Sequence, residues 1–155
     1  MKKCIVVLLV MVLMLLTLSG CFQSLVKKAL GGANYSSKDD SFVVKTEDGE
    51  AIISGGKGQK WPTGKMGDLP ELKGNISSSV SSKDGEMISV DDVTMAEVKA
   101  YIAKVKALGY EGDELALSEN MVMFTGTKGD YGVYIQFASD SKDAKGTCII
   151  TYGKN

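Results

Sequence analysis

The residues best suited to chemistry by type and spacing are Leu18, Ser19, Gly20 and Cys21. A cysteine sulfur is a strong nucleophile that can accept a lipid. Leu18 suits an apolar pocket, and Ser19 and Gly20 are small enough for the backbone to enter a peptidase cleft. The stretch therefore predicts that Cys21 takes a diacylglycerol on its thiol. It also predicts cleavage directly before Cys21, with the three preceding residues recognised by the signal peptidase.

The residues before this stretch have the layout of a secretory signal. Lys2 and Lys3 give a positive start, and residues 4–16 form an unbroken apolar run. A membrane-spanning helix needs about 20 apolar residues, whereas this run is shorter and leads into small residues. We therefore predict that residues 1–20 are removed. The alternatives are an uncleaved anchor, or an ordinary signal followed by a chance cysteine.

The whole stretch resembles the signal of bacterial lipoproteins as a class. The resemblance implies that Cys21 carries two or three acyl chains, which anchor a protein stably where a single chain does not. The membrane is thus the first expected partner. The mature chain is expected to be lipid-anchored at the extracytoplasmic face of the cell membrane or of an outer membrane. Phe22 rather than Asp follows the cysteine, and the sequence does not choose between a one-membrane and a two-membrane cell.

Composition excludes several functional classes. All 18 basic residues are lysines, and the sequence contains no His. Without His there is no imidazole base, no Ser–His or Cys–His nucleophile pair and no His metal ligand. Without Arg the usual bidentate reader of phosphate and guanine is missing. A formal net charge of −1 gives no basic surface for nucleic acid. We expect no nucleic-acid partner, no metal and no cofactor.

Cysteine usage predicts a domain without disulfides. The chain has three Cys; Cys4 lies in the signal and Cys21 is assigned to the lipid, which leaves Cys148 alone. Cys148 lies in a strand-like stretch, residues 147–152, and no imidazole is available to activate it. It is expected to be a small buried hydrophobic residue rather than a catalytic thiolate.

The mature chain is predicted to consist of a tether and one domain. Residues 21–41 form the lipidated anchor and a polar linker. Within them, apolar residues recur at helical spacing over 22–30, which indicates either an interfacial helix in the headgroup layer or a frayed tether. Residues 42–155 form the extracytoplasmic domain. It divides into a first hairpin at 42–54, a glycine-rich loop at 55–74 and a sheet–helix–sheet unit at 75–155.

The predicted fold class of this domain is α+β. A mainly antiparallel sheet is built from hairpins, and one amphipathic helix packs on one face of it. Asp-Gly turns at Asp48 and Asp84 each join two strand-like stretches, within 42–54 and 75–90, which is a hairpin signal. A third hairpin is predicted over 121–138 and a last strand over 146–152.

The best-specified element is a helix expected from Met95 to about Leu108. Thr94 and Glu97 form a capping box before it, and Gly109 supplies a left-handed cap after it. One apolar stripe of this helix is expected to be buried, namely Val98, Tyr101, Ile102, Val105 and Leu108.

A contact surface is expected on the sheet face that the helix leaves open to water. Tyr134, Gln136 and Tyr152 are the candidate partner-contact residues there. Trp61 in the glycine-rich loop is either a core residue under a crossing loop, which we favour, or an exposed anchor for a partner. The Gly and Lys residues of this loop do not have the spacing of a phosphate-binding loop.

Signals for catalysis are weak. Ser24 with Lys27, and Ser139 with Lys142, fit Ser-x-x-Lys, a nucleophile–base pair in some acyl-transferring enzymes. Acidic clusters at 39–40, 91–92, 111–114 and 140–143 lack the spacing of a calcium loop. No catalytic residue is assigned. We favour a membrane-tethered binding or adaptor domain for an envelope protein, peptide or glycan. An envelope enzyme that uses carboxylates or a Ser–Lys pair is the alternative, and convergence of these groups in a cleft would favour it.

Four further features occur in a characteristic order. They are Glu47-Asp48-Gly49, Trp61-Pro62 after the glycine-rich loop, Leu108-Gly109-Tyr110 at the helix end, and Gly132-Val133-Tyr134. In this order, residues 40–155 resemble a family of small bacterial lipoproteins whose C-terminal domain has no assigned function. The resemblance supplies no catalytic residues.

Overall fold

The structure is a computed structural model that describes residues 34–36, 41–46, 49–56 and 58–155. The chain divides into two units, Met1–Asn34 and Tyr35–Asn155, and nearly all described residues belong to the second. The predicted signal at 1–20, the lipid site at Cys21 and the stretch 22–30 lie outside the described residues. Among the described residues, no helix has the length and apolar content needed to cross a membrane.

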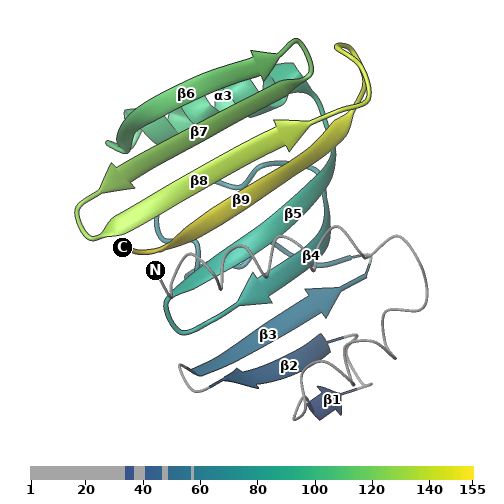
Figure 1. The fold of residues 1–155 in the computed structure, drawn as a ribbon, viewed down its shortest axis with the longest axis vertical. Coiled ribbons are helices and arrows are strands. Elements are labelled where there is room, and N and C mark those ends of the chain that lie inside the picture. Colours follow the sequence, from purple (N-terminus) through teal and green to yellow (C-terminus); the bar gives the residue numbers. More distant parts are fainter. Residues whose placement is uncertain (1–33, 37–40, 47–48, 57) are drawn as a thin grey trace. The chain divides into compact units, whose positions relative to one another are not determined.

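A single sheet organises the described residues (Figure 1). Its nine strands run in the order β1-β2-β3-β4-β5-β9-β8-β7-β6. The strands are β1 (Asn34–Ser36), β2 (Ser41–Thr46), β3 (Gly49–Gly55), β4 (Asn75–Ser81), β5 (Gly85–Val93), β6 (Glu111–Ser118), β7 (Met121–Lys128), β8 (Tyr131–Ala138) and β9 (Gly146–Lys154). Every neighbouring pair from β2 onward is antiparallel. The predicted class, α+β with mostly antiparallel β-structure, is confirmed.

The three predicted hairpins are confirmed as β2–β3, β4–β5 and β7–β8. The last predicted strand, 146–152, is β9 and runs on to Lys154. Strand β1 lies in the stretch predicted as a linker, 21–41, so the predicted start of the domain at residue 42 was too late. Strand β6 was not predicted either. All of its residues are exposed, so its sequence lacks the alternation of buried and exposed residues that marks a strand with one face in the core.

Helix α3 (Met95–Ala107) follows β5 and has the predicted capping box. The Glu97 backbone N–H donates to Thr94 Oγ1 at 3.3 Å, and the Thr94 backbone N–H donates to Glu97 Oε2 at 2.8 Å. Gly109 has φ +93°, the left-handed conformation expected for the cap. The predicted stripe is buried except for Leu108, which lies at the helix end and is 36% exposed.

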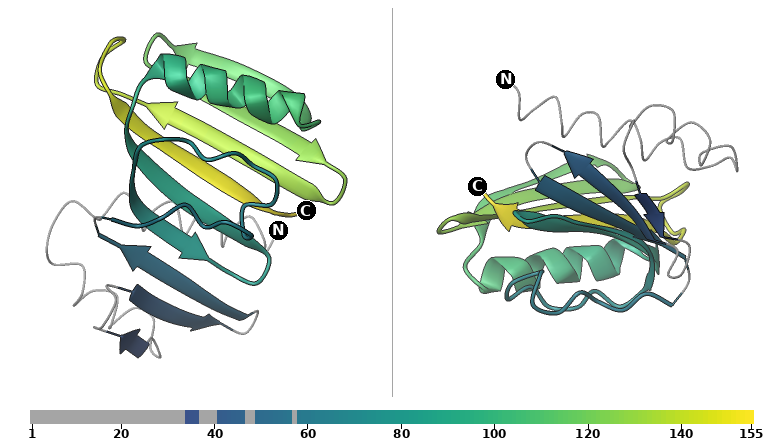
Figure 2. Two further views of the ribbon diagram at one scale, coloured as in Figure 1. Left: turned by 180° about the vertical axis from the view of Figure 1, so that it is seen from behind. Right: turned by 90° about the horizontal axis from the view of Figure 1, so that it is seen from below.

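Two elements cover the same face of the sheet (Figure 2). One is α3, and the other is the crossing segment, residues 58–74, which connects β3 to β4 without forming a helix or strand. The core between these covers and the sheet includes Trp61, Met66, Leu69 and Leu72 of the crossing segment. Trp61 is 9% exposed, so the favoured role of Trp61 as a core residue is confirmed.

Cys148 in β9 is fully buried and free. Burial raises the pKa of its thiol to about 12, because the charged thiolate would be poorly solvated there. The prediction that Cys148 is a buried hydrophobic residue is confirmed.

Candidate functional site

A pocket of about 370 Å³ lies at the end of the sheet where β5 and β8 begin. The crossing segment, the β4–β5 turn and strands β8 and β9 contribute its walls. We call it the tyrosine pocket; its lining residues are Gly64, Lys65, Gly67, Ser82, Lys83, Asp84, Gly85, Tyr131 and Tyr152. Segments that are far apart in the sequence thus meet at one place.

Two stacked tyrosines form the aromatic wall of the tyrosine pocket. The rings of Tyr131 and Tyr152 are parallel to within 2°, and their centroids are 5.4 Å apart. The sheet register explains the stack: Tyr131 lies opposite Lys154, so Tyr152 is its diagonal neighbour on the same face. Tyr152 is 9% exposed and Tyr131 is 44% exposed. The outer ring is therefore accessible, and the inner ring holds it in place.

Gly67 allows the crossing segment to pack closely against Tyr152. Its φ is +57°, and a Cβ added there would lie 2.3 Å from the Tyr152 hydroxyl oxygen. Only glycine combines that backbone conformation with so close an approach. The position of the crossing segment over Tyr152 therefore depends on this residue.

A buried carboxyl lies behind the tyrosine pocket. Glu86 is opposite Ser81 on β4 and opposite Tyr152 on β9. Glu86 is 3% exposed, and its Oε2 atom is buried without a hydrogen-bond partner. Desolvation raises the pKa of Glu86, while a hydrogen bond with Ser81 and the charge of Lys65 act in the opposite direction. Lys65 Nζ also donates a hydrogen bond to Ser81 Oγ, which ties the crossing segment to β4.

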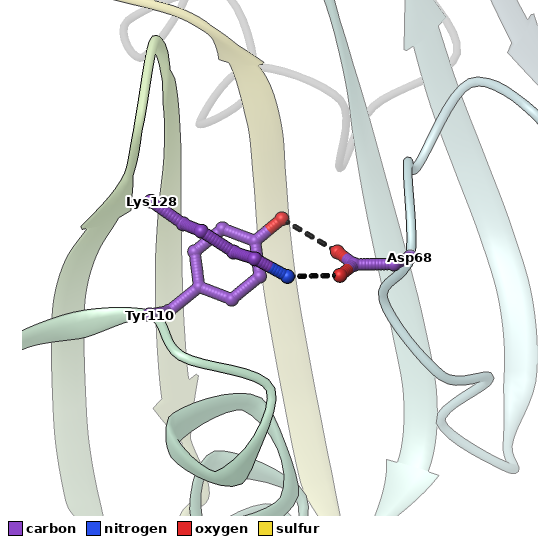
Figure 3. Close-up of polar contacts among 3 residues, drawn as sticks. All are labelled: Asp68, Tyr110 and Lys128. Atoms are coloured by element: carbon purple, nitrogen blue, oxygen red, sulfur yellow. Dashed lines mark hydrogen bonds and ion pairs between the residues drawn. The ribbon is translucent and has the colours of Figure 1, made fainter.

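A second polar cluster fixes the crossing segment further along (Figure 3). Tyr110 donates its hydroxyl proton to Asp68 Oδ1 at 2.8 Å, and Lys128 Nζ donates to Asp68 Oδ2. Lys128 Nζ also lies 5.4 Å from the centroid of the Tyr110 ring. The hydrogen bonds from Lys128 and Tyr110 lower the pKa of Asp68, and burial is the largest cause that raises the pKa of Tyr110. This cluster connects the crossing segment to the loop after α3 and to the end of β7.

The structure brings together a Ser–Lys pair, but not the predicted one. Ser81 and Lys65 are in contact, whereas Ser139 Oγ donates to the Ser141 carbonyl and Lys142 is exposed. A lysine that acts as a base has to be desolvated, and the Lys65 side chain is exposed. The contact therefore serves as a polar clamp on the crossing segment rather than as a nucleophile–base pair.

The predicted acidic candidates do not converge in the described part of the chain. Asp91 accepts a hydrogen bond from Thr147 Oγ1 at 2.7 Å. No group of three or more Cys, Asp or Glu residues that could hold a metal ion occurs among the described residues. Ser24 and Lys27 lie outside them.

The predicted contact residues separate onto two faces. Tyr134 and Gln136 alternate with the buried residues of β8, so they lie on the face away from α3. The Tyr134 hydroxyl donates to Gln136 Oε1 at 2.9 Å. The placement of Tyr152 on that face was wrong: it alternates with Cys148 and Ile150 onto the covered face. The predicted partner role of Tyr134 and Gln136 is an alternative to the tyrosine pocket, because the two lie on opposite faces of the sheet.

Sequence reasoning missed Lys65, Glu86 and Tyr131 as members of one site. A signal existed for Glu86, because it occupies the buried face of β5 in alternation with Ile88 and Val90, and a carboxyl at such a position is unusual. Comparisons with protein-family models, with curated proteins and with solved structures find no match to this chain.

Proposed function

We propose that this chain is a lipid-anchored bacterial lipoprotein whose sheet domain, Tyr35–Asn155, binds a component of the cell envelope. The bound component is an envelope protein, a peptide or a glycan. The observation that carries the binding role is the tyrosine pocket, in which an exposed aromatic ring lies beside Lys65, Lys83 and Asp84. Its volume falls in the range of ligand pockets, ~300–1,000 Å³.

The same arrangement favours binding over catalysis. An aromatic residue that is already held in place by a neighbour loses little freedom when a ligand contacts it. Tyr131 has this property, because its ring is stacked on Tyr152. The Ser–Lys contact beside the pocket has an exposed lysine, and the predicted Ser139 and Lys142 lie elsewhere.

The anchor is supported by the sequence alone. Cys21 follows Leu18, Ser19 and Gly20, and the residues between Cys21 and β1 would tether the domain to the membrane. We expect Cys21→Ala to leave an unprocessed precursor, while the wild-type chain partitions into detergent. A wild-type product in the aqueous phase, with no added lipid mass, would contradict the anchor.

Photo-crosslinking in cells tests the binding role. We would replace Tyr131 with p-benzoylphenylalanine in the full chain and use the same replacement at Tyr134 as the matched control on the opposite face. We expect adducts from position 131 and none from position 134. Adducts from position 134 alone would place the contact surface on the other face of the sheet. If neither position gave adducts, a binding role for either face would be contradicted.

A further inference from the structure

The exposed ring of Tyr131 is suited to a ligand with a flat apolar face. One face of a sugar ring presents C–H groups, which pack against an aromatic ring through dispersion and weak C–H contacts. Tyr131 is 44% exposed and is held by its stack with Tyr152. A ligand would therefore meet a rigid aromatic surface.

The polar groups of the tyrosine pocket match a ligand that both donates and accepts hydrogen bonds. Lys65 and Lys83 are donors, and the Asp84 carboxylate is an acceptor. The Ser82 hydroxyl donates to the Gly85 carbonyl at 3.1 Å, so its oxygen is left as an acceptor. Ser82 is held by its own turn, where the Gly85 N–H donates to Ser82 Oγ at 3.2 Å. Each hydroxyl of a sugar both donates and accepts, whereas a phosphate at neutral pH mainly accepts.

The charge of the tyrosine pocket is mixed in sign rather than strongly positive. Two ammonium groups, on Lys65 and Lys83, stand beside one carboxylate, on Asp84, so the lining residues carry one positive charge in excess. A site selected for phosphate would carry a larger excess of positive charge, commonly with Arg. The chain has no Arg, and the Asp84 carboxylate in the wall of this pocket would repel a phosphate.

We propose that the tyrosine pocket binds a neutral saccharide unit of an envelope glycan, with a sugar ring packed on Tyr131 and its hydroxyls bonded to Lys83, Asp84 and Ser82. This assignment rests on the proposed binding function and narrows its ligand to one class. Peptide and phosphate are the competing ligands.

The composition of the crosslinked adduct separates this inference from the binding function. The adduct formed in cells at position 131 would be digested with trypsin, and the mass of the modified peptide would be measured. Hexose or N-acetylhexosamine increments are the expected result. Amino-acid increments would overturn the saccharide assignment while the binding function stands, and absence of any adduct would overturn both.

A sedimentation assay tests the same assignment with purified components. The probe is insoluble envelope polysaccharide stripped of protein by protease, mixed with the lipidated chain in detergent. We expect binding that falls at least tenfold on Tyr131→Ala, survives Tyr134→Ala and disappears when soluble fragments of the same polysaccharide are added in excess. No binding, or equal binding by the Tyr131→Ala variant with unchanged circular dichroism, would contradict the assignment.

Discussion

Helix α3 and the crossing segment cover the same face of one sheet, yet different interactions hold them. The helix is capped at both ends and buries Val98, Ile102 and Val105 completely. The crossing segment has no regular hydrogen-bond pattern. It combines the apolar anchors of residues 61–72 with two polar clamps, one at Lys65 and one at Asp68.

The difference separates stability from the proposed binding role. A helix satisfies its backbone groups internally, and its buried stripe contributes directly to the free energy of unfolding. A segment fastened by a few side chains opens locally at lower cost, and binding residues are often carried by such irregular segments on a rigid scaffold. Here the tyrosine pocket lies at the edge of the crossing segment, not under the helix.

The largest effect is expected for Ile102→Ala in α3. Ile102 is fully buried, so the lost burial and the cavity should lower the free energy of unfolding by about 3 kcal/mol. Urea denaturation measures it. Lys99→Ala is a matched control, because Lys99 is exposed on the same helix and should change stability by less than about 0.5 kcal/mol. A similar loss in both variants would contradict the role given to the buried stripe.

Met66→Ala makes the corresponding change in the crossing segment. Met66 is 1% exposed, and truncation should lower stability by about 2 kcal/mol. We expect faster amide exchange in residues 58–74 and weaker crosslinking from position 131, while the α3 amides lose only the protection that corresponds to the lower free energy of global unfolding. If residues 58–74 of the variant exchanged with the same opening free energy as α3, the two covers would act as one unit.

Glu86→Gln tests the buried carboxyl. Desolvation raises the pKa of Glu86 in the folded state. The protonated side chain therefore contributes fully to the stability of the domain below the unfolded-state pKa, and this contribution is lost as the pH rises through the folded-state pKa. Glu86→Gln removes the charge and keeps the shape, so it should stabilise the domain near pH 7 by about 1 kcal/mol. Urea denaturation from pH 4 to pH 8 should show a smaller decline for the variant. Lower stability of the variant at pH 7 would mean that Lys65 and Ser81 compensate the buried charge.

The smallest effect is expected for Tyr110→Phe. The change removes the donor to Asp68 Oδ1 and should cost about 1 kcal/mol or less. It should also move the pKa of Asp68 back towards its ordinary value, which a carboxyl NMR titration measures. Tyr101→Phe is the matched control, because the buried Tyr101 hydroxyl has no hydrogen-bond partner. A larger loss for Tyr101→Phe than for Tyr110→Phe would contradict the clamp.

The elements that could be predicted from the sequence are those specified by residues close together in the chain. The α3 capping box uses residues three apart, two of the hairpins form at Asp-Gly turns, and Cys148 lies in an alternating strand. Strand β6 has no such local pattern, because its residues are all exposed. It is a strand because it pairs with β7.

The tyrosine pocket could not be predicted because it depends on register. Tyr131 and Tyr152 stack only because β8 and β9 pair with one particular alignment. The contact of Lys65 with Ser81 requires the crossing segment to return over β4, which no local pattern specifies. The face of Tyr152, by contrast, was readable from its alternation with Cys148 and Ile150.

Native-state hydrogen exchange tests most directly whether the two covers differ. Amides of residues 58–74 should exchange through local openings that cost clearly less free energy than global unfolding, while the α3 amides exchange only when the whole domain unfolds. If the two sets of amides instead show the same opening free energy and the same denaturant dependence, the crossing segment is no more separable than the helix. The division between a stabilising cover and a pocket-forming cover would then be wrong.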